Sequence, residues 1–124
     1  MRLLMWLFGA RIELPGVLLA HFPELADATW RRGGLALRIG GWCLGRATVS
    51  GITLGHTIAL APSAPLDAEL LLHELRHVHQ FEADPYFPLR YAWRSVRHGY
   101  TANPYEVDAR AFAARRLAES HLTA

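Results

Sequence analysis

The hydrophobic and polar positions of the chain predict a first half rich in strands and a second half that is helical. Short apolar runs with β-branched residues, bounded by glycines, predict strands at 35–39 and 52–60. From position 68 onward the apolar residues recur every three or four positions, which predicts helices over about 68–82, 86–97 and 104–120. Strands followed by helices favour an α+β fold.

The predicted helices carry start and stop signals. Asp67 is a candidate N-cap for the first helix, and Asp84 followed by proline ends it. Gly99 stops the second helix. Pro104 begins the third, at the first helical position, where a missing N–H removes no helical hydrogen bond.

The first ten residues are apolar, and positions 3–8 predict either a helix or an opening strand. Arg11 and Glu13 interrupt this stretch well before the roughly 20 residues that a membrane-spanning helix needs, so no transmembrane segment is predicted. We expect these apolar side chains to pack into the core, and contact with a membrane surface is the alternative. The same expectation applies to the four tryptophans, Trp6, Trp30, Trp42 and Trp93.

Length and composition indicate one folded domain over 1–124, with an N-terminal segment (1–50) and a core segment (51–124). Hydrophobic residues make up 52% of the chain and charged residues 19%, which excludes a disordered protein. The single cysteine, Cys43, excludes an internal disulfide and favours a reducing compartment, so we expect a cytoplasmic protein.

Charge does not favour a nucleic-acid partner, because the net charge is only +2 and the 13 basic residues, all arginine, are scattered. Arg90, Arg94 and Arg97 are the exception, since their spacing places them on one side of a helix. A solvated face is the simpler interpretation of this set, and a site for a phosphate or an acidic partner is the alternative.

The strongest chemical signal is the pentad His73-Glu74-Leu75-Arg76-His77 inside the first predicted helix. Two histidines four residues apart lie about 40° apart around a helix and about 6 Å along it, which allows them to share one metal ion. Glu74 is placed to take a proton from water on that metal. Burying imidazoles and a carboxylate in so apolar a segment costs free energy unless hydrogen bonds or a metal ion satisfy their polar atoms. This favours a Zn²⁺ site over exposed surface histidines.

A catalytic zinc site has three protein ligands and one open position. Glu106 and Asp108, near the start of the third predicted helix, are candidate third ligands. They lie about 200° apart around that helix, so one would bind the metal while the other supports a ligand or faces solvent. His98 is a rival third ligand. His98 and Tyr100 are also candidates for stabilising an oxyanion.

Two more residues of the pentad helix are placed by their angle around its axis. Gln80, seven residues after His73, returns to the metal face, where it would contact substrate or pack beneath the site. His79 lies about 200° from His77 and is expected to point away from the metal.

The chain resembles the zincin metallopeptidases, specifically the gluzincin branch typified by thermolysin-like enzymes and their minimal single-domain relatives, at His73, Glu74, His77 and Glu106. The resemblance covers about residues 50–118. It implies a zincin-like fold in which a small antiparallel or mixed sheet precedes the active-site helix and a downstream helix supplies the glutamate. It also implies a His₂Glu zinc site and an antiparallel edge strand, here 52–60, that binds the substrate backbone.

The resemblance implies a zinc-dependent hydrolase of peptide bonds, with a peptide or protein as substrate and Glu74 as the general base. Gluzincins often carry an aspartate four residues after the ligand glutamate, where this chain has Arg110, so Asp108 becomes the candidate to orient a histidine. Two alternatives stay open. One is a catalytically silent binding or assembly domain stapled by zinc, and the other is a metal-free structural protein. The sequence does not indicate the oligomeric state.

Overall fold

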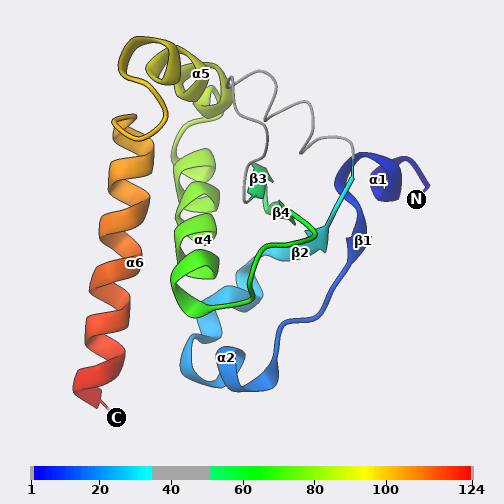
Figure 1. Cartoon of the computed structure of the whole chain (residues 1–124), viewed down its shortest axis with the longest axis vertical. Coiled ribbons are helices and arrows are strands. Elements are labelled where there is room, and N and C mark those ends of the chain that lie inside the picture. Colours follow the sequence, from blue (N-terminus) through cyan, green and yellow to red (C-terminus); the bar gives the residue numbers. More distant parts are fainter. Residues whose placement is uncertain (1, 35–50, 124) are drawn as a thin grey trace.

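The computed structural model describes residues 2–34 and 51–123, and its elements confirm the α+β class. The predicted strand at 35–39, Trp42 and Cys43 lie outside the described residues. The elements, in chain order, are α1 (Arg2–Phe8), β1 (Ala10–Arg11), α2 (Gly16–His21), the 3-10 helix η1 (Pro23–Asp27), β2 (Thr29–Arg32), β3 (Gly51–Leu54), β4 (Thr57–Leu60), α4 (Ala68–Ala83), α5 (Phe87–His98) and α6 (Pro104–Thr123) (Figure 1).

The sheet is small and mixed, with the strand order β1-β2-β4-β3. The two central strands, β2 and β4, run parallel, with Trp30 opposite Ile58. Both outer strands, β1 and β3, pair antiparallel with their neighbours. Because β3 is last in the strand order, it forms one edge of this sheet and lies against β4. This agrees with the small antiparallel or mixed sheet expected before the pentad helix.

The segment 52–60, predicted as a single strand, is a hairpin, and that prediction was wrong. Gly55 and His56 form the two-residue turn between β3 and β4. Gly55 has φ 60°, which is typical of the first residue of a type II′ hairpin turn. The β-branched residues continue on both sides of the turn, so composition did not reveal it. His56, predicted within a strand, lies at the turn 3.3 Å from Glu82 of α4.

The helices begin and end at the predicted signals. Asp67 caps α4, because its Oδ1 accepts a hydrogen bond from the backbone N–H of Leu70 at 2.8 Å. The helix ends before Asp84. Gly99 follows α5 with φ 78°, a conformation that glycine adopts without strain, and α6 begins at Pro104.

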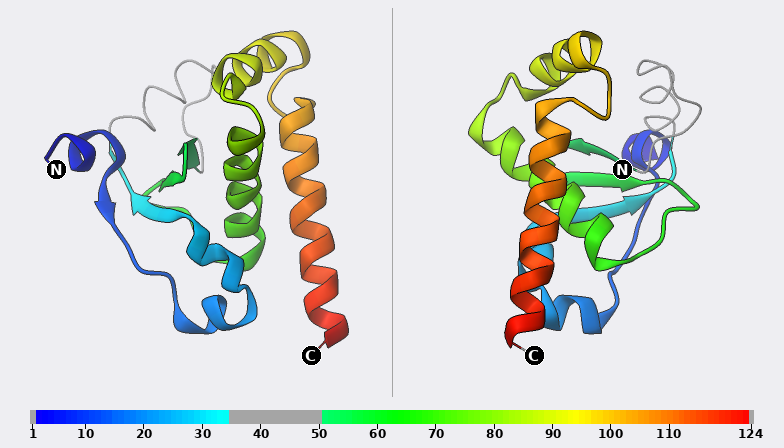
Figure 2. Two further views of the ribbon diagram at one scale, coloured as in Figure 1. Left: turned by 180° about the vertical axis from the view of Figure 1, so that it is seen from behind. Right: turned by 60° about the vertical axis from the view of Figure 1, so that its left-hand side comes forward.

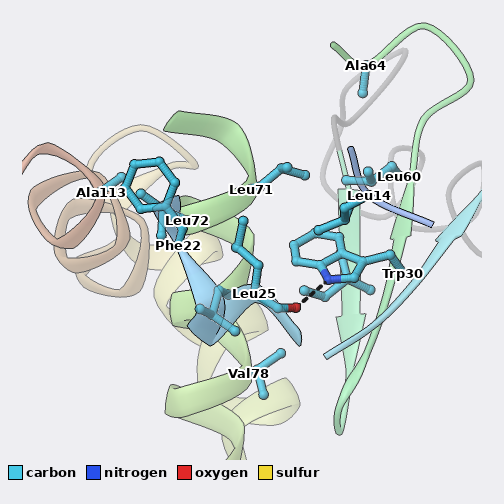
Figure 3. Close-up of a cluster of buried hydrophobic side chains, with 12 residues drawn as sticks. Leu14, Phe22, Leu25, Trp30, Leu60, Ala64, Leu71, Leu72, Val78 and Ala113 are labelled. Carbon is cyan, nitrogen blue, oxygen red and sulfur yellow. Dashed lines mark hydrogen bonds between the residues drawn. The ribbon is translucent and has the colours of Figure 1, made fainter. Parts of the chain in front are cut away.

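Helix α4 lies between the sheet and α6. Helix α6 runs alongside α4, and α5 sits across one end of this pair of helices (Figures 1 and 2). The core fills the space between the sheet and α4 and includes Trp30, whose indole N–H donates to the carbonyl of Leu25 at 2.8 Å (Figure 3). The helix α4 is therefore packed on two sides, which holds its pentad in a fixed orientation.

Two tryptophans expected in the core lie at the surface instead. Trp30 is buried as predicted, but Trp6 on α1 and Trp93 on α5 are 62% and 60% exposed. Val96 of α5 is 81% exposed as well, whereas Phe87 of the same helix is buried. The apolar spacing thus correctly predicted that α5 is a helix, but the prediction that Trp93 lies on its core side was wrong. Within the described part of the chain, no helix is both long and apolar enough to cross a membrane.

Candidate metal centre

The two pentad histidines project from one side of α4. His73 and His77 are four residues apart, and their ring centroids lie 5.2 Å apart. Their side chains are 16% and 7% exposed. The leucines of the same segment pack into the core, so the histidines occupy a side of α4 that the sheet does not cover.

Glu106 joins both histidines from the first turn of α6. Its Oε2 lies 2.7 Å from Nε2 of His73, and its Oε1 lies 2.9 Å from Nε2 of His77. One ligand atom from each residue lies within 4.8 Å of the others, which makes the trio a possible metal site. The predicted third ligand is therefore placed beside the two histidines.

Asn103 holds the start of α6 in position. This fully buried residue accepts a hydrogen bond from the backbone N–H of Tyr105 at 2.9 Å through its side-chain oxygen. Its amide nitrogen donates to the carbonyl of Tyr91 at 3.1 Å and to the hydroxyl of Ser95 at 2.8 Å, both on α5. The cap thus fixes the position of Glu106, three residues into α6, relative to both helices.

Gln80 determines which ring nitrogen of His77 carries a proton. Its amide nitrogen donates to the carbonyl of Tyr105 at 3.0 Å and to Asp108 at 2.9 Å, so its oxygen must be the atom that faces His77. That oxygen lies 2.8 Å from Nδ1 of His77 and accepts its N–H. In the neutral imidazole, Nε2 then presents a lone pair toward Glu106, which is the arrangement of a metal ligand.

Asp108 lies behind this arrangement and not among the ligand atoms. It accepts a hydrogen bond from Arg76 Nε at 2.8 Å and another from Gln80. The Arg76 bond is the main reason that the pKa of Asp108 is lowered. Asp108 therefore acts on His77 through the Gln80 amide, and the histidine support expected of it is indirect.

Tyr91 is a site residue that sequence reasoning missed. Its hydroxyl, on α5, donates to Oε1 of Glu106 at 2.8 Å. Burial and the Glu106 carboxylate raise the pKa of this phenol, which keeps it a hydrogen-bond donor. The available signal was its position six residues before the predicted end of this helix, on the side opposite Trp93. The spacing alone did not distinguish a residue that supports a ligand from a core residue.

Ionisation within the trio follows from its contacts. Burial opposes the charged form of Glu106, but the hydrogen bonds with His73 and His77 outweigh it and lower the carboxyl pKa. Burial would also lower the pKa of His77, but the Glu106 bond and the nearby carboxylates raise it to about 9. The buried Glu106 carboxylate therefore needs a positive charge between itself and the two imidazoles, which either protons or a metal cation can supply.

Glu74 points to a different side of α4, toward the edge strand β3. It is 4% exposed, and burial raises its pKa. A Cβ atom placed on Gly51 would lie 3.1 Å from Cδ of Glu74 and 3.2 Å from its Oε2. Glycine at the start of β3 therefore leaves the space that this carboxylate occupies.

Thr53 of β3 carries a buried hydroxyl without a hydrogen-bond partner in the described part of the chain. Because side chains alternate along a strand, Thr53 shares the face of β3 on which a Gly51 Cβ would meet Glu74. The hydroxyl therefore lies on the side of β3 that faces α4 and has no hydrogen-bond partner among the described residues.

The two other predicted residues are not part of the trio. His98, the last residue of α5, is exposed, and the metal-site geometry selects Glu106 over both His98 and Asp108 as the partner of the histidines. Tyr100 follows α5, is partly buried, and is close enough to Tyr91 to raise the pKa of that phenol. His79 contacts Phe112, with ring centroids 5.6 Å apart, on a side of α4 away from the trio, as expected.

Comparison with known proteins gives no relative: no family model matches the chain, and neither the curated proteins nor the solved structures contain a significant match to it.

Proposed function

We propose that the protein is a zinc-dependent hydrolase of peptide bonds with a zincin-like arrangement of its site. The carrying observation is that Gln80 turns the Nε2 lone pair of His77 toward the point where His73 and Glu106 also converge. Two imidazole nitrogens and one carboxylate oxygen are a donor set that Zn²⁺ binds in catalytic sites.

The residues fit the metal in chemistry and in burial. His73, His77 and Glu106 would hold the ion, which would supply Lewis acidity and a water of lowered pKa. The support of the ligands also fits, because Gln80 orients His77 while Tyr91 hydrogen-bonds Glu106. Metal-binding histidines and carboxylates are usually oriented by such neighbours.

Glu74 is the proposed general base. Its burial and the resulting rise in pKa suit a carboxylate that takes a proton from attacking water and then delivers it to the leaving amine. Glu74 precedes His77 by three residues and faces β3, while the histidines face α5 and α6. The carboxylate is thus beside the trio without being one of its ligand groups.

The proposed substrate site is the β3 side of Glu74. An extended peptide can add to the edge of a sheet through backbone hydrogen bonds, and β3 is an edge strand of the described sheet. The sequence placed the substrate-binding strand at 52–60. The present proposal assigns substrate binding to β3 alone, the first strand of that hairpin.

One observation favours the alternative of a zinc staple without catalysis. The ligand side chains are only 16%, 7% and 3% exposed, and they connect α4 to α6 directly. A metal there would tie the two helices together even if no substrate reached it. The alternative differs from the hydrolase in activity and not in metal content.

The deciding experiment begins with metal analysis of protein purified without an affinity tag. We expect one zinc per chain in the wild type and in Glu74→Gln, and loss of zinc in Glu106→Ala. Peptide-library hydrolysis is then measured with and without a chelator. The hydrolase proposal requires activity that the chelator removes, that returning zinc restores, and that Glu74→Gln lacks.

The outcomes separate the candidates. Zinc binding with no hydrolysis of any peptide would support the staple and contradict the enzyme. Absence of zinc binding at micromolar concentrations would contradict both. Hydrolysis that persists in Glu74→Gln would show that another residue is the base.

A further inference from the structure

Helix α5 exposes an apolar stripe on the side that faces away from the protein. Leu89, Trp93 and Val96 are 71%, 60% and 81% exposed. At about 100° per residue these three positions fall within an arc of roughly 60°. Tyr86, just before the helix, is 65% exposed and extends the same side. A contiguous apolar stripe of this kind on a surface helix indicates a binding face.

Arginines flank the stripe. Arg90, Arg94 and Arg97 lie along one side of it and are exposed, at angles of about 80° to 140° from Leu89. Arg90 pairs with Asp84 at 2.7 Å, whereas Arg94 and Arg97 form no ion pair with any carboxylate of the described residues. The sequence of α5 contains no aspartate, glutamate, asparagine or glutamine.

The opposite side of α5 attaches the helix to the metal centre. Phe87, its single buried residue, stacks on the ring of His77 with centroids 6.0 Å apart, and Tyr91 donates to Glu106. Tyr91 lies about 160° around the axis from Trp93. The stripe is thus presented outward by a helix whose other side is held by aromatic and hydrogen-bond contacts.

We propose that this face of α5 binds the surface of an anionic lipid membrane. A helix with aliphatic residues and tryptophan on one side, and arginines beside them, lies in the bilayer interface with its apolar side among the acyl chains and its cations at the headgroups. Charge complementarity favours anionic lipid, because the two unpaired arginines would face phosphates at that depth.

The charged side chains of α5 are all basic, since the helix has no carboxylate, and this composition suits an anionic surface. The helix also lies at one end of the molecule, across the end of α4 and α6, in all three views (Figures 1 and 2). The metal centre would then lie about one helix diameter, roughly 10 Å, from the membrane surface.

The proposal is tested by sedimenting the purified protein with vesicles. Vesicles of phosphatidylcholine alone are compared with vesicles that also contain phosphatidylglycerol, at low and at high salt. We expect binding to the anionic vesicles that weakens as salt rises, and little binding to the neutral ones. The Glu74→Gln protein should bind equally well, because the stripe lies on the side of α5 away from the metal centre.

Variants assign the binding to α5. Arg94→Gln with Arg97→Gln should reduce the affinity about fivefold per arginine, or about 25-fold together. Replacing Leu89, Trp93 and Val96 by serine should reduce it at least about tenfold. The matched controls are exposed residues of other elements, Arg11→Gln with Arg115→Gln and Val17→Ser with Val107→Ser, which should leave binding unchanged.

All of these side chains are exposed, so unchanged thermal unfolding would show that the variants fold. Three outcomes overturn the proposal. The first is no binding to anionic vesicles. The second is equal loss of binding in the control variants. The third is self-association of the wild type that the serine variant abolishes, since the stripe would then be an interface between copies of this chain.

Discussion

Gln80 and His77 form a side-chain pair that sets which ring nitrogen of His77 is free to bind a metal at the candidate site. The Gln80 oxygen accepts the Nδ1–H of His77 at 2.8 Å, and the Gln80 amide nitrogen is held by Tyr105 and Asp108. The Gln80 amide cannot flip without losing both of its acceptors. The neutral His77 ring therefore keeps its proton on Nδ1 and leaves the Nε2 that faces Glu106 without one. A residue outside the pentad thus controls a pentad ligand.

We expect Gln80→Leu to lower zinc affinity about 10- to 100-fold, the usual effect of removing the partner that orients a metal-binding histidine. Gln80→Glu keeps an acceptor for His77 but sets a carboxylate oxygen against Asp108 and the Tyr105 carbonyl, so it should also bind zinc more weakly than the wild type. Competition with a chromogenic chelator measures both, with circular dichroism to confirm folding. Equal affinity of Gln80→Leu and wild type would show that His77 needs no such support.

Tyr91→Phe removes the hydroxyl that donates to the buried Glu106 carboxylate. Because hydrogen bonds to charged groups contribute about 1.5–3 kcal/mol, the metal-free protein should lose roughly that much free energy of unfolding. Urea denaturation in chelator measures the loss. Tyr86→Phe is the matched control, since Tyr86 is 65% exposed and should show no change. Equal stabilities of the two variants would contradict the role of Tyr91.

Gly51→Ala places a methyl group about 3.1 Å from Cδ of Glu74. The overpacking should cost about 1–3 kcal/mol of stability and displace the proposed base. We therefore expect peptide hydrolysis to fall while zinc affinity stays the same, because the ligands lie on other sides of α4. Gly16→Ala is the control, since a Cβ there meets nothing within 4 Å. A Gly51→Ala protein with lost zinc and intact hydrolysis would be incompatible with this assignment.

Stability of the metal-free protein should depend on pH in a defined way. The pKa of His77 rises from 6.5 to about 9 in the folded state, mainly through Glu106, although burial opposes the rise. Its stabilisation is therefore complete below pH 6.5 and is lost as the pH rises toward 9. The raised pKa of Glu74 acts in the same direction.

Glu106 has the opposite sign. Its pKa is lowered from 4.5, so its stabilisation is present above pH 4.5 and is lost on acidification. Denaturation in chelator should therefore show greatest stability between about pH 4.5 and 6.5. Saturating zinc should remove the part of the high-pH decline that comes from His77, because zinc takes the place of the His77 proton. A flat profile from pH 6.5 to 9 without metal would contradict the His77–Glu106 coupling.

The second half of the fold was largely predictable, because its signals are local. The side chain of Asp67 bonds a backbone group three residues away, and Gly99 and Pro104 act through their own backbone conformations. The hairpin within 52–60 was missed, since Gly55 was its sole turn signal. The exposure of Trp93 was missed because periodicity indicates that a helix has two sides and does not say which one meets the core.

The sequence by itself determined the helices, the placement of His73 and His77 on one side of α4, and the position of Glu74 between them, because all of these follow from helical geometry. Only the tertiary structure decided that Glu106 joins the histidines while Asp108 reaches His77 through Gln80. The packing of α6 against α4 made that choice. Contacts between residues 25 or more positions apart depend on how whole helices pack, which no local pattern encodes.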